Sequence, residues 1–168
     1  MLLKKTLPFF CFLCLVTLTA QAQLTLNETE IIRLLPENLM SGFTIQDRPK
    51  SKMMKVGNLT YSLAEKNFVL GKKMIKILLF DYSEASIMYS QATKKFVNVN
   101  EVESDSLVLR TLIIENGNGW EVDNSRNHSS QIQLGIFERF YLTMEGINVP
   151  LEELKEAFEM IRVEKFPR

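Results

Sequence analysis

Residues 74–82 read Met74-Ile75-Lys76-Ile77-Leu78-Leu79-Phe80-Asp81-Tyr82, the strongest β-strand pattern in the chain. Branched and aromatic side chains of this kind favour extended backbone. The preceding segment, residues 56–69, alternates apolar and polar side chains with period two, which is typical of a strand with one buried face. Gly71 lies between the two segments and favours a turn. We therefore expect the two segments to form an antiparallel hairpin.

Four more strands are expected farther along the chain, at residues 106–115, 120–123, 131–137 and 139–145. Asn116-Gly117-Asn118-Gly119 is the clearest turn, because Asn-Gly accepts the positive φ that tight hairpins require. A second tight turn is expected near Glu138. Hairpin connections of this kind join antiparallel neighbours, so the sheet should be mainly antiparallel.

Three helices are expected around these strands. Asn27 and Glu30 have the spacing of a capping box, and Pro36 ends the helix that they begin. Apolar residues at helical spacing predict a middle helix over residues 84–96. A C-terminal helix is expected to begin at Pro150 and to carry a single apolar stripe, made of Leu151, Leu154, Ala157, Phe158 and Ile161.

These elements predict an α+β fold, in which a mainly antiparallel twisted sheet of about six strands packs against N-terminal, middle and C-terminal helices. No internal repeat or long linker divides the sequence. We therefore expect residues 23–168 to form a single domain, within the usual size range.

The first 22 residues have the pattern of a cleaved signal peptide. Lys4 and Lys5 precede an apolar run that ends in Ala20-Gln21-Ala22, a small-x-small cleavage pattern. The run is shorter than the roughly 20 residues that cross a bilayer. The sequence thus predicts a periplasmic or secreted protein with no stable membrane span after cleavage. Both cysteines, Cys11 and Cys14, lie inside this run, so the mature chain would have none.

Composition excludes several classes of protein. Of the 168 residues, 46% are hydrophobic and 24% are charged, which excludes a disordered or fibrous chain. The 20 basic residues are balanced by 20 acidic ones, so there is no basic excess to neutralise nucleic acid. Neither a metal site nor a cofactor motif is evident, and we expect no cofactor.

His128, with Asp123 nearby in the sequence, is the weak candidate for catalysis. A histidine titrates near neutral pH and serves as a general base when an acid orients its ring. The bland interpretation is a solvated histidine in a polar loop. The hydrolytic interpretation requires both side chains to meet in a cleft.

Three further residues are weak candidates for ligand binding. Asp81 follows an apolar strand, where functional groups are common, but it also precedes the predicted middle helix, whose positive end favours a carboxylate. Arg139 lies among aromatic residues and could bind a carboxylate; the alternative is an ion pair with an acid across the sheet. Met88 could line an apolar cleft beside the middle helix, or simply fill the core.

Three segments together resemble small exported bacterial proteins of the Bacteroidetes type, of uncharacterised function. They are residues 73–82, residues 116–122, and residues 137–146 followed by the final helix. In outline such proteins are similar to α+β domains of the PsbP-like kind. The resemblance implies an antiparallel sheet with helices over roughly residues 50–162, and it implies no catalytic residues.

The function that we expect is binding without turnover. The occupant would be an envelope protein or a small apolar ligand, held between the helix of residues 84–96 and the sheet or on an exposed edge. The alternative is a hydrolytic enzyme that uses His128 and Asp123.

Overall fold

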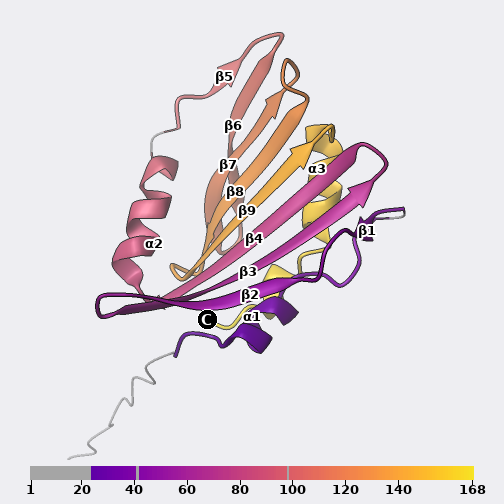
Figure 1. Ribbon diagram of the computed structural model, residues 1–168. Helices are drawn as coiled ribbons and strands as arrows, with labels where there is room; N and C mark the ends of the chain where they lie inside the picture. Colours follow the sequence, from indigo (N-terminus) through magenta and orange to yellow (C-terminus); the bar gives the residue numbers. More distant parts are fainter. Residues whose placement is uncertain (1–23, 41, 98) are drawn as a thin grey trace, which may run out of the picture.

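The computed structural model describes residues 24–40, 42–97 and 99–168 (Figure 1). The predicted signal peptide and its two cysteines lie outside the described residues. The helices and strands follow one another in this order: α1 (Glu28–Arg33), β1 (Thr44–Ile45), β2 (Lys50–Val56), β3 (Leu59–Leu70), β4 (Lys73–Glu84), α2 (Ser86–Thr93), η1 (Lys94–Phe96), β5 (Val102–Glu103), β6 (Leu107–Ile114), β7 (Gly117–Asn124), β8 (Ser129–Ile136), β9 (Phe140–Ile147), α3 (Leu151–Glu159) and η2 (Val163–Lys165).

The strands form one open sheet of nine strands, in the order β1-β3-β4-β9-β8-β7-β6-β5, with β2 also paired to β3. Every pairing is antiparallel. The sheet consists of two meanders, β2–β4 and β5–β9, which meet where β4 pairs with β9 (Figure 1). The predicted α+β fold and antiparallel sheet are thus confirmed.

The expected number of about six strands is wrong, because three strands lie in segments that lack a core-facing alternation. β2 is an edge strand whose side chains are all exposed or half-exposed. β1 and β5 have two residues each, and all four residues are exposed. An edge strand pairs on one side only and need not bury a face, so its sequence shows little of the apolar pattern that reveals central strands.

The predicted hairpin of residues 56–82 is confirmed as β3–β4, and the turn near Glu138 is confirmed between β8 and β9. Phe137 and Glu138 both have a φ of 54°, as the central residues of a type I′ turn would. The turn predicted at residues 116–119 lies earlier in the chain, at Glu115 and Asn116. Gly117 and Gly119 instead belong to β7, where a Cβ atom at either position would collide with the backbone of β8. Close approach of two strands therefore requires these glycines.

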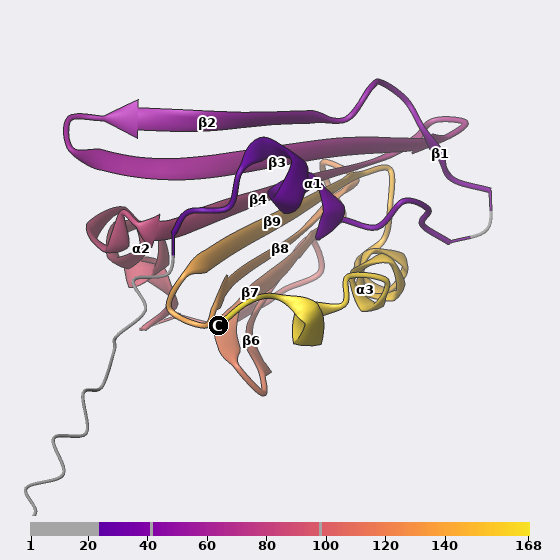
Figure 2. The ribbon, with the colours of Figure 1, turned by 90° about the horizontal axis from the view of Figure 1, so that it is seen from below.

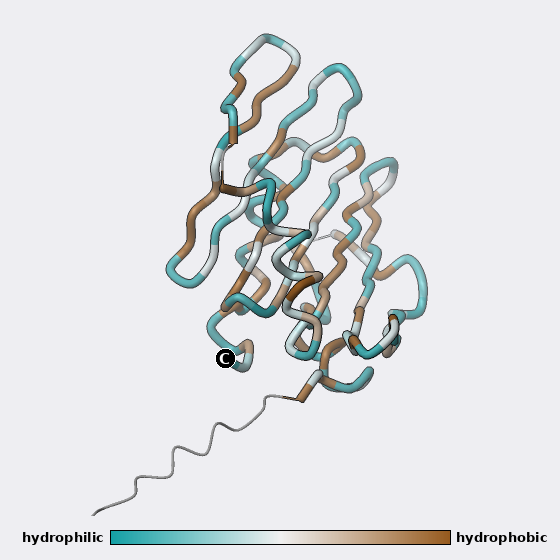
Figure 3. Tube along the Cα trace, turned by 90° about the vertical axis from the view of Figure 1, so that its left-hand side faces the viewer, coloured by the Kyte–Doolittle hydropathy of each residue, from teal (hydrophilic) through white to brown (hydrophobic). Residues whose placement is uncertain are grey.

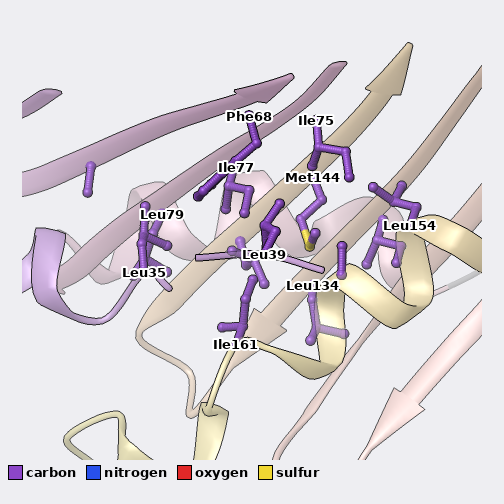
Figure 4. Close-up of a cluster of buried hydrophobic side chains, with 14 of the residues drawn as sticks. Leu35, Leu39, Phe68, Ile75, Ile77, Leu79, Leu134, Met144, Leu154 and Ile161 are labelled. Atoms are coloured by element: carbon purple, nitrogen blue, oxygen red, sulfur yellow. The ribbon is translucent and has the colours of Figure 1, made fainter. Parts of the chain in front are cut away.

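One face of the sheet, here called the core face, is covered by α1 and α3 (Figure 2). The predicted capping box is present, since the Asn27 side chain accepts from the Glu30 N–H and the Glu30 side chain accepts from the Asn27 N–H. Figure 4 shows Leu35, Leu39 and Ile161 packed against the strands. The sheet residues beneath them are fully buried: Ala64, Phe68, Ile75, Ile77, Leu79, Ile132, Leu134, Ile136, Phe140, Leu142 and Met144.

The opposite face, here called the open face, is contacted by α2 over β4, β9 and β8. Figure 3, in which the side of the molecule bearing α2 faces the viewer, shows hydrophobic and hydrophilic residues alternating along the strands. The predicted middle helix is confirmed as α2 and η1, which are anchored at their ends by buried Ala85 and Phe96, whereas α2 itself buries no residue. Within the described residues, no helix is both long and apolar enough to span a membrane.

Candidate functional site

The open face presents side chains that alternate with those of the core. Along one row across the sheet, strand register places Leu78 beside Thr143, Thr143 beside Gln133, and Gln133 beside Trp120. All four are half-exposed, whereas the neighbouring core-face residues are fully buried. Aromatic, amide and hydroxyl groups thus stand together at the surface of a rigid sheet.

Lys95 in η1 lies over this row and contacts its polar and aromatic side chains. Its ammonium donates to the Gln133 Oε1 atom at 2.5 Å, and the Tyr141 hydroxyl donates to the same oxygen at 2.6 Å. The Lys95 Nζ atom lies 5.3 Å from the ring centroid of Trp120, 5.7 Å from that of Tyr141 and 5.8 Å from that of Phe96. We call Lys95, Phe96, Trp120, Gln133 and Tyr141 the Lys95 cluster.

Electrostatic effects in the Lys95 cluster follow from its partial removal from water. Desolvation lowers the pKa of Lys95, because the ammonium lies among three rings. Desolvation likewise raises the pKa of Tyr141. The face of an aromatic ring attracts a cation, which offsets part of the cost of removing the ammonium from water.

Two donors of the Lys95 cluster are available to a ligand. Two donor groups already fill the Gln133 Oε1 atom, but in the described part of the chain no acceptor meets the Gln133 amide N–H groups or the Trp120 indole N–H. Both residues are half-exposed, and neither nitrogen is among the fully buried side-chain atoms that lack a partner, so water or an incoming partner can reach these donors. The cluster can therefore donate hydrogen bonds and offer aromatic surface at one place.

A row of aromatic rings extends from the Lys95 cluster across β4 to β3. The ring of Tyr141 lies 5.8 Å from that of Phe80, Phe80 stacks with Tyr82 at 5.6 Å, and Tyr82 lies 5.4 Å from Tyr61. Burial raises the pKa of Tyr82 to about 12, and the nearby Tyr61 and Tyr141 hydroxyls add to the shift. This row gives the open face a continuous aromatic strip.

Met88 lies on α2 and is half-buried, so it contributes to the packing of α2 against the open face. One residue along, Tyr89 approaches the sheet where β8 carries Gly135, and a Cβ atom at Gly135 would lie 2.6 Å from the Tyr89 hydroxyl. Desolvation is the main cause that raises the pKa of Tyr89, and the negative charge of Glu138 raises it further. The absence of a side chain at Gly135 thus allows α2 to approach the sheet.

Asp81 and Arg139 form an ion pair on the core face, away from the Lys95 cluster. The Arg139 Nε and Nη2 atoms donate to the two carboxylate oxygens of Asp81, each at 2.8 Å. The side chains of Asp81 and Arg139 are 0% and 6% exposed. For Arg139, the structure thus shows the ion pair with an acid across the sheet. Asp81 does not interact with the positive end of α2, which begins at Ser86.

The same ion pair fastens the segment that precedes α1. The Leu26 N–H donates to the Asp81 Oδ2 atom at 2.8 Å, and the Arg139 Nη2 atom donates to the Leu24 carbonyl at 3.3 Å. A bidentate pair with further backbone partners satisfies the hydrogen-bonding capacity of a buried carboxylate. Its geometry indicates a role in holding the N-terminal segment against the sheet.

His128 and Asp123 line a common cavity of about 390 Å³ at the β7–β8 turn, together with Ser125 and Asn148. His128 is exposed in this turn, with a φ of 49°. Among the described residues, its ring makes no hydrogen bond or ion pair. The two candidates are therefore neighbours, but the ring is not oriented by the carboxylate as acid–base catalysis requires. No group of three or more His, Cys, Asp or Glu side chains in the described ranges could hold a metal ion.

Sequence reasoning did not single out the residues of the Lys95 cluster. The alternation of residues 131–137 and 139–145 already places Gln133 and Tyr141 on the side opposite the apolar core positions. Amides and aromatics on such a side are the available signal. The position of Lys95 depends on how α2 and η1 cross the sheet, which the pattern does not contain.

Comparisons with known proteins add little to this geometry. No protein-family model matches the sequence, and no curated protein matches it. Among solved structures, a GTP-binding regulator from Thermotoga maritima aligns with a TM-score of 0.40 and 13% sequence identity, over 73% of this chain and 79% of that one. A likeness of this size supports no inference about this protein.

Proposed function

We propose that this protein is an exported, non-catalytic binding domain, and that its open face docks a partner protein of the cell envelope around the Lys95 cluster. The observation that carries this proposal is the Lys95 cluster itself, in which exposed Lys95 lies near three rings and donates to one amide, and Trp120, Gln133 and Tyr141 are half-exposed. Tryptophan and tyrosine are enriched in the parts of protein interfaces that dominate binding energy.

A protein partner suits this surface better than a small apolar ligand. Ligand pockets are typically concave and mostly apolar. The open face is instead a broad sheet surface on which Glu65, Lys76, Gln131 and Thr143 alternate with the aromatic strip. The unused N–H groups of Trp120 and Gln133 would find carbonyl acceptors on a partner backbone. A small apolar ligand would leave those donors without an acceptor.

A photo-crosslinking experiment in the native host tests this proposal. A photoreactive phenylalanine analogue is placed at Gln133 on the open face and, as a matched control, at exposed Glu156 on α3. We expect a discrete crosslinked protein from position 133 that is absent from position 156 and is lost when Trp120 is changed to Ala. Equal crosslinking at both positions, or none at 133, would contradict the proposal.

Export is tested separately by mass spectrometry of the protein purified from its host envelope. We expect a mature chain that begins after Ala22. A chain that retains Met1 in the soluble cell contents would overturn the periplasmic or secreted location without affecting the docking surface.

Hydrolysis is the second candidate function, because the cavity at the β7–β8 turn brings Asp123, Ser125 and His128 together. The test is hydrolysis of a series of p-nitrophenyl esters by the purified protein. Turnover that disappears in His128→Ala would establish the hydrolytic alternative. We expect no difference between His128→Ala and the unaltered protein, since the ring is not paired with an acid in the described structure.

A further inference from the structure

A second surface feature lies on the side of the sheet that bears α1 and α3. A cavity of about 600 Å³ separates the end of α1 and the loop after it from the segment that follows α3. Arg33, Arg162 and Lys165 line it, and Glu37 is the acidic residue of its lining. Leu34, Pro36 and Met160 supply apolar wall. The cavity therefore combines an excess of positive charge with apolar surface.

The three cations of this cavity are exposed, and they have no anionic partner among the residues that the structure describes. Within the residues that the structure describes, the side chains of Arg33, Arg162 and Lys165 make no hydrogen bond or ion pair. Some cations elsewhere are paired, as in Lys73–Glu153 at 2.6 Å and Lys76–Glu65 at 3.8 Å. Three cations from two separate segments, unpaired within the described part of the chain, thus line one cavity.

Several backbone carbonyls near the cavity already accept hydrogen bonds from other donors, so they are not free to pair with these three cations. The buried Lys66 ammonium donates to the carbonyls of Leu35 and Pro36, each at 3.1 Å. The Arg162 carbonyl accepts from the Lys165 N–H at 2.9 Å. Lys66 is only 6% exposed and desolvation lowers its pKa, so its side chain serves these carbonyls and is not counted among the cations of the cavity.

We propose that this cavity binds a small organic anion. A carboxylate or phosphate group would lie among Arg33, Arg162 and Lys165, with an apolar body against Leu34, Pro36 and Met160. A guanidinium presents a planar fork of donors that matches both groups. The volume of the cavity lies within the range of ordinary ligand pockets. This site is independent of the docking surface proposed above, which lies on the other face of the sheet.

Binding of four probes tests the site by isothermal titration calorimetry and by amide NMR shifts: decanoate, decyl phosphate, inorganic phosphate and the neutral decanol. We expect decanoate and decyl phosphate to bind, and decanol to bind at least tenfold more weakly. Inorganic phosphate that binds as tightly as decyl phosphate would contradict the proposed contact of an apolar body with Leu34, Pro36 and Met160. Tighter binding of decyl phosphate would identify an amphiphile.

A pair of double variants separates a specific site from general charge. Arg33→Gln with Arg162→Gln should weaken binding of decanoate at least tenfold. Arg48→Gln with Arg126→Gln removes the same charge from two exposed positions away from the cavity and should leave binding unchanged. Lys165→Gln supplies a milder variant should the first lose its folded NMR spectrum. Failure of both anions to bind at millimolar concentration, equal weakening in both double variants, or equal binding of decanol would overturn the proposal.

Discussion

The two faces of the sheet are covered to very different extents. On the core face, Ile77 and Leu79 of β4 are 0% exposed beneath α1 and α3. On the open face, Leu78 and Phe80 of the same strand remain half-exposed beside α2. Because hydrophobic stabilisation scales with the apolar area removed from water, the core face carries most of the stability. The open face can therefore present groups for contact at little cost to the fold.

One polar group of residues on each face shows a similar contrast. The core face encloses Asp81 and Arg139 as a fully satisfied ion pair. The open face holds Lys95 beside Gln133, whose amide N–H groups meet no acceptor among the described residues. A satisfied buried pair restrains the structure, whereas accessible unsatisfied donors can exchange water for a partner. The difference suggests which face can bind without disturbing the fold.

The largest effect is expected from Asp81→Ala on the core face. It leaves the Arg139 guanidinium buried without its carboxylate and removes the acceptor of the Leu26 N–H. Removing one partner of a buried pair costs about 3–5 kcal/mol. The free energy of unfolding, measured by urea denaturation, should fall by that amount.

A matched control for this prediction is Glu103→Ala, which breaks the exposed Arg110–Glu103 pair. An exposed pair contributes about 1 kcal/mol or less. The double change Asp81→Leu with Arg139→Met, which removes both charges, should recover part of the loss. A cost for Asp81→Ala no larger than for Glu103→Ala would show that the ion pair does not hold the core face together.

The sequence predicts the central strands well because their two faces differ. The β3–β4 hairpin is evident from alternation and from an apolar run, since one face of each strand is buried. By contrast, β2 has exposed Met53 and Val56 among three lysines, and it lies at an edge. Because neither face of β2 is buried, its sequence shows no alternation of apolar and polar residues that would predict a strand.

The candidate sites are less predictable for a physical reason. Asp81 and Arg139 are far apart in sequence, and only the pairing of β4 with β9 brings them together. Asp123 and His128 are close in sequence, so their common cavity at a turn is easier to anticipate. Lys95 meets Gln133 through the path of α2 over the sheet, a long-range feature without a local sequence pattern.

The next largest effect compares adjacent residues of β9 that face opposite sides. Leu142 is fully buried on the core face, and Leu142→Ala should cost about 2–5 kcal/mol through lost burial and an unfilled cavity. Thr143 is half-exposed on the open face, and Thr143→Ala should change stability by about 0.5 kcal/mol or less. Urea denaturation of the two variants measures the contrast directly. Equal losses would mean that both faces contribute comparably to folding.

A smaller effect is expected at alkaline pH from Tyr82, where α2 meets the open face. Its pKa is raised to about 12 in the folded protein, so the folded state retains a proton that the unfolded chain loses near pH 10. Stability is therefore intact below pH 10 and decreases as the pH rises toward 12, by about 2 kcal/mol from this residue. Tyr82→Phe keeps the ring and should reduce that decrease in denaturation curves measured at pH 9, 10, 11 and 12. An unchanged pH dependence in the variant would contradict the burial of this hydroxyl.

An effect smaller than that of Tyr82 is expected from Lys95→Met, within the Lys95 cluster itself. Methionine keeps the apolar stem but removes the cation above the rings of Trp120 and Tyr141. The loss should be about 0.5–1 kcal/mol, the usual value of a cation–π contact at an exposed site. Trp120 is the one tryptophan of the sequence, so its fluorescence emission should change in Lys95→Met even though the fold persists. If this change instead destabilised the protein as strongly as Leu142→Ala, the open face would be a second core, and its availability to a partner would no longer follow.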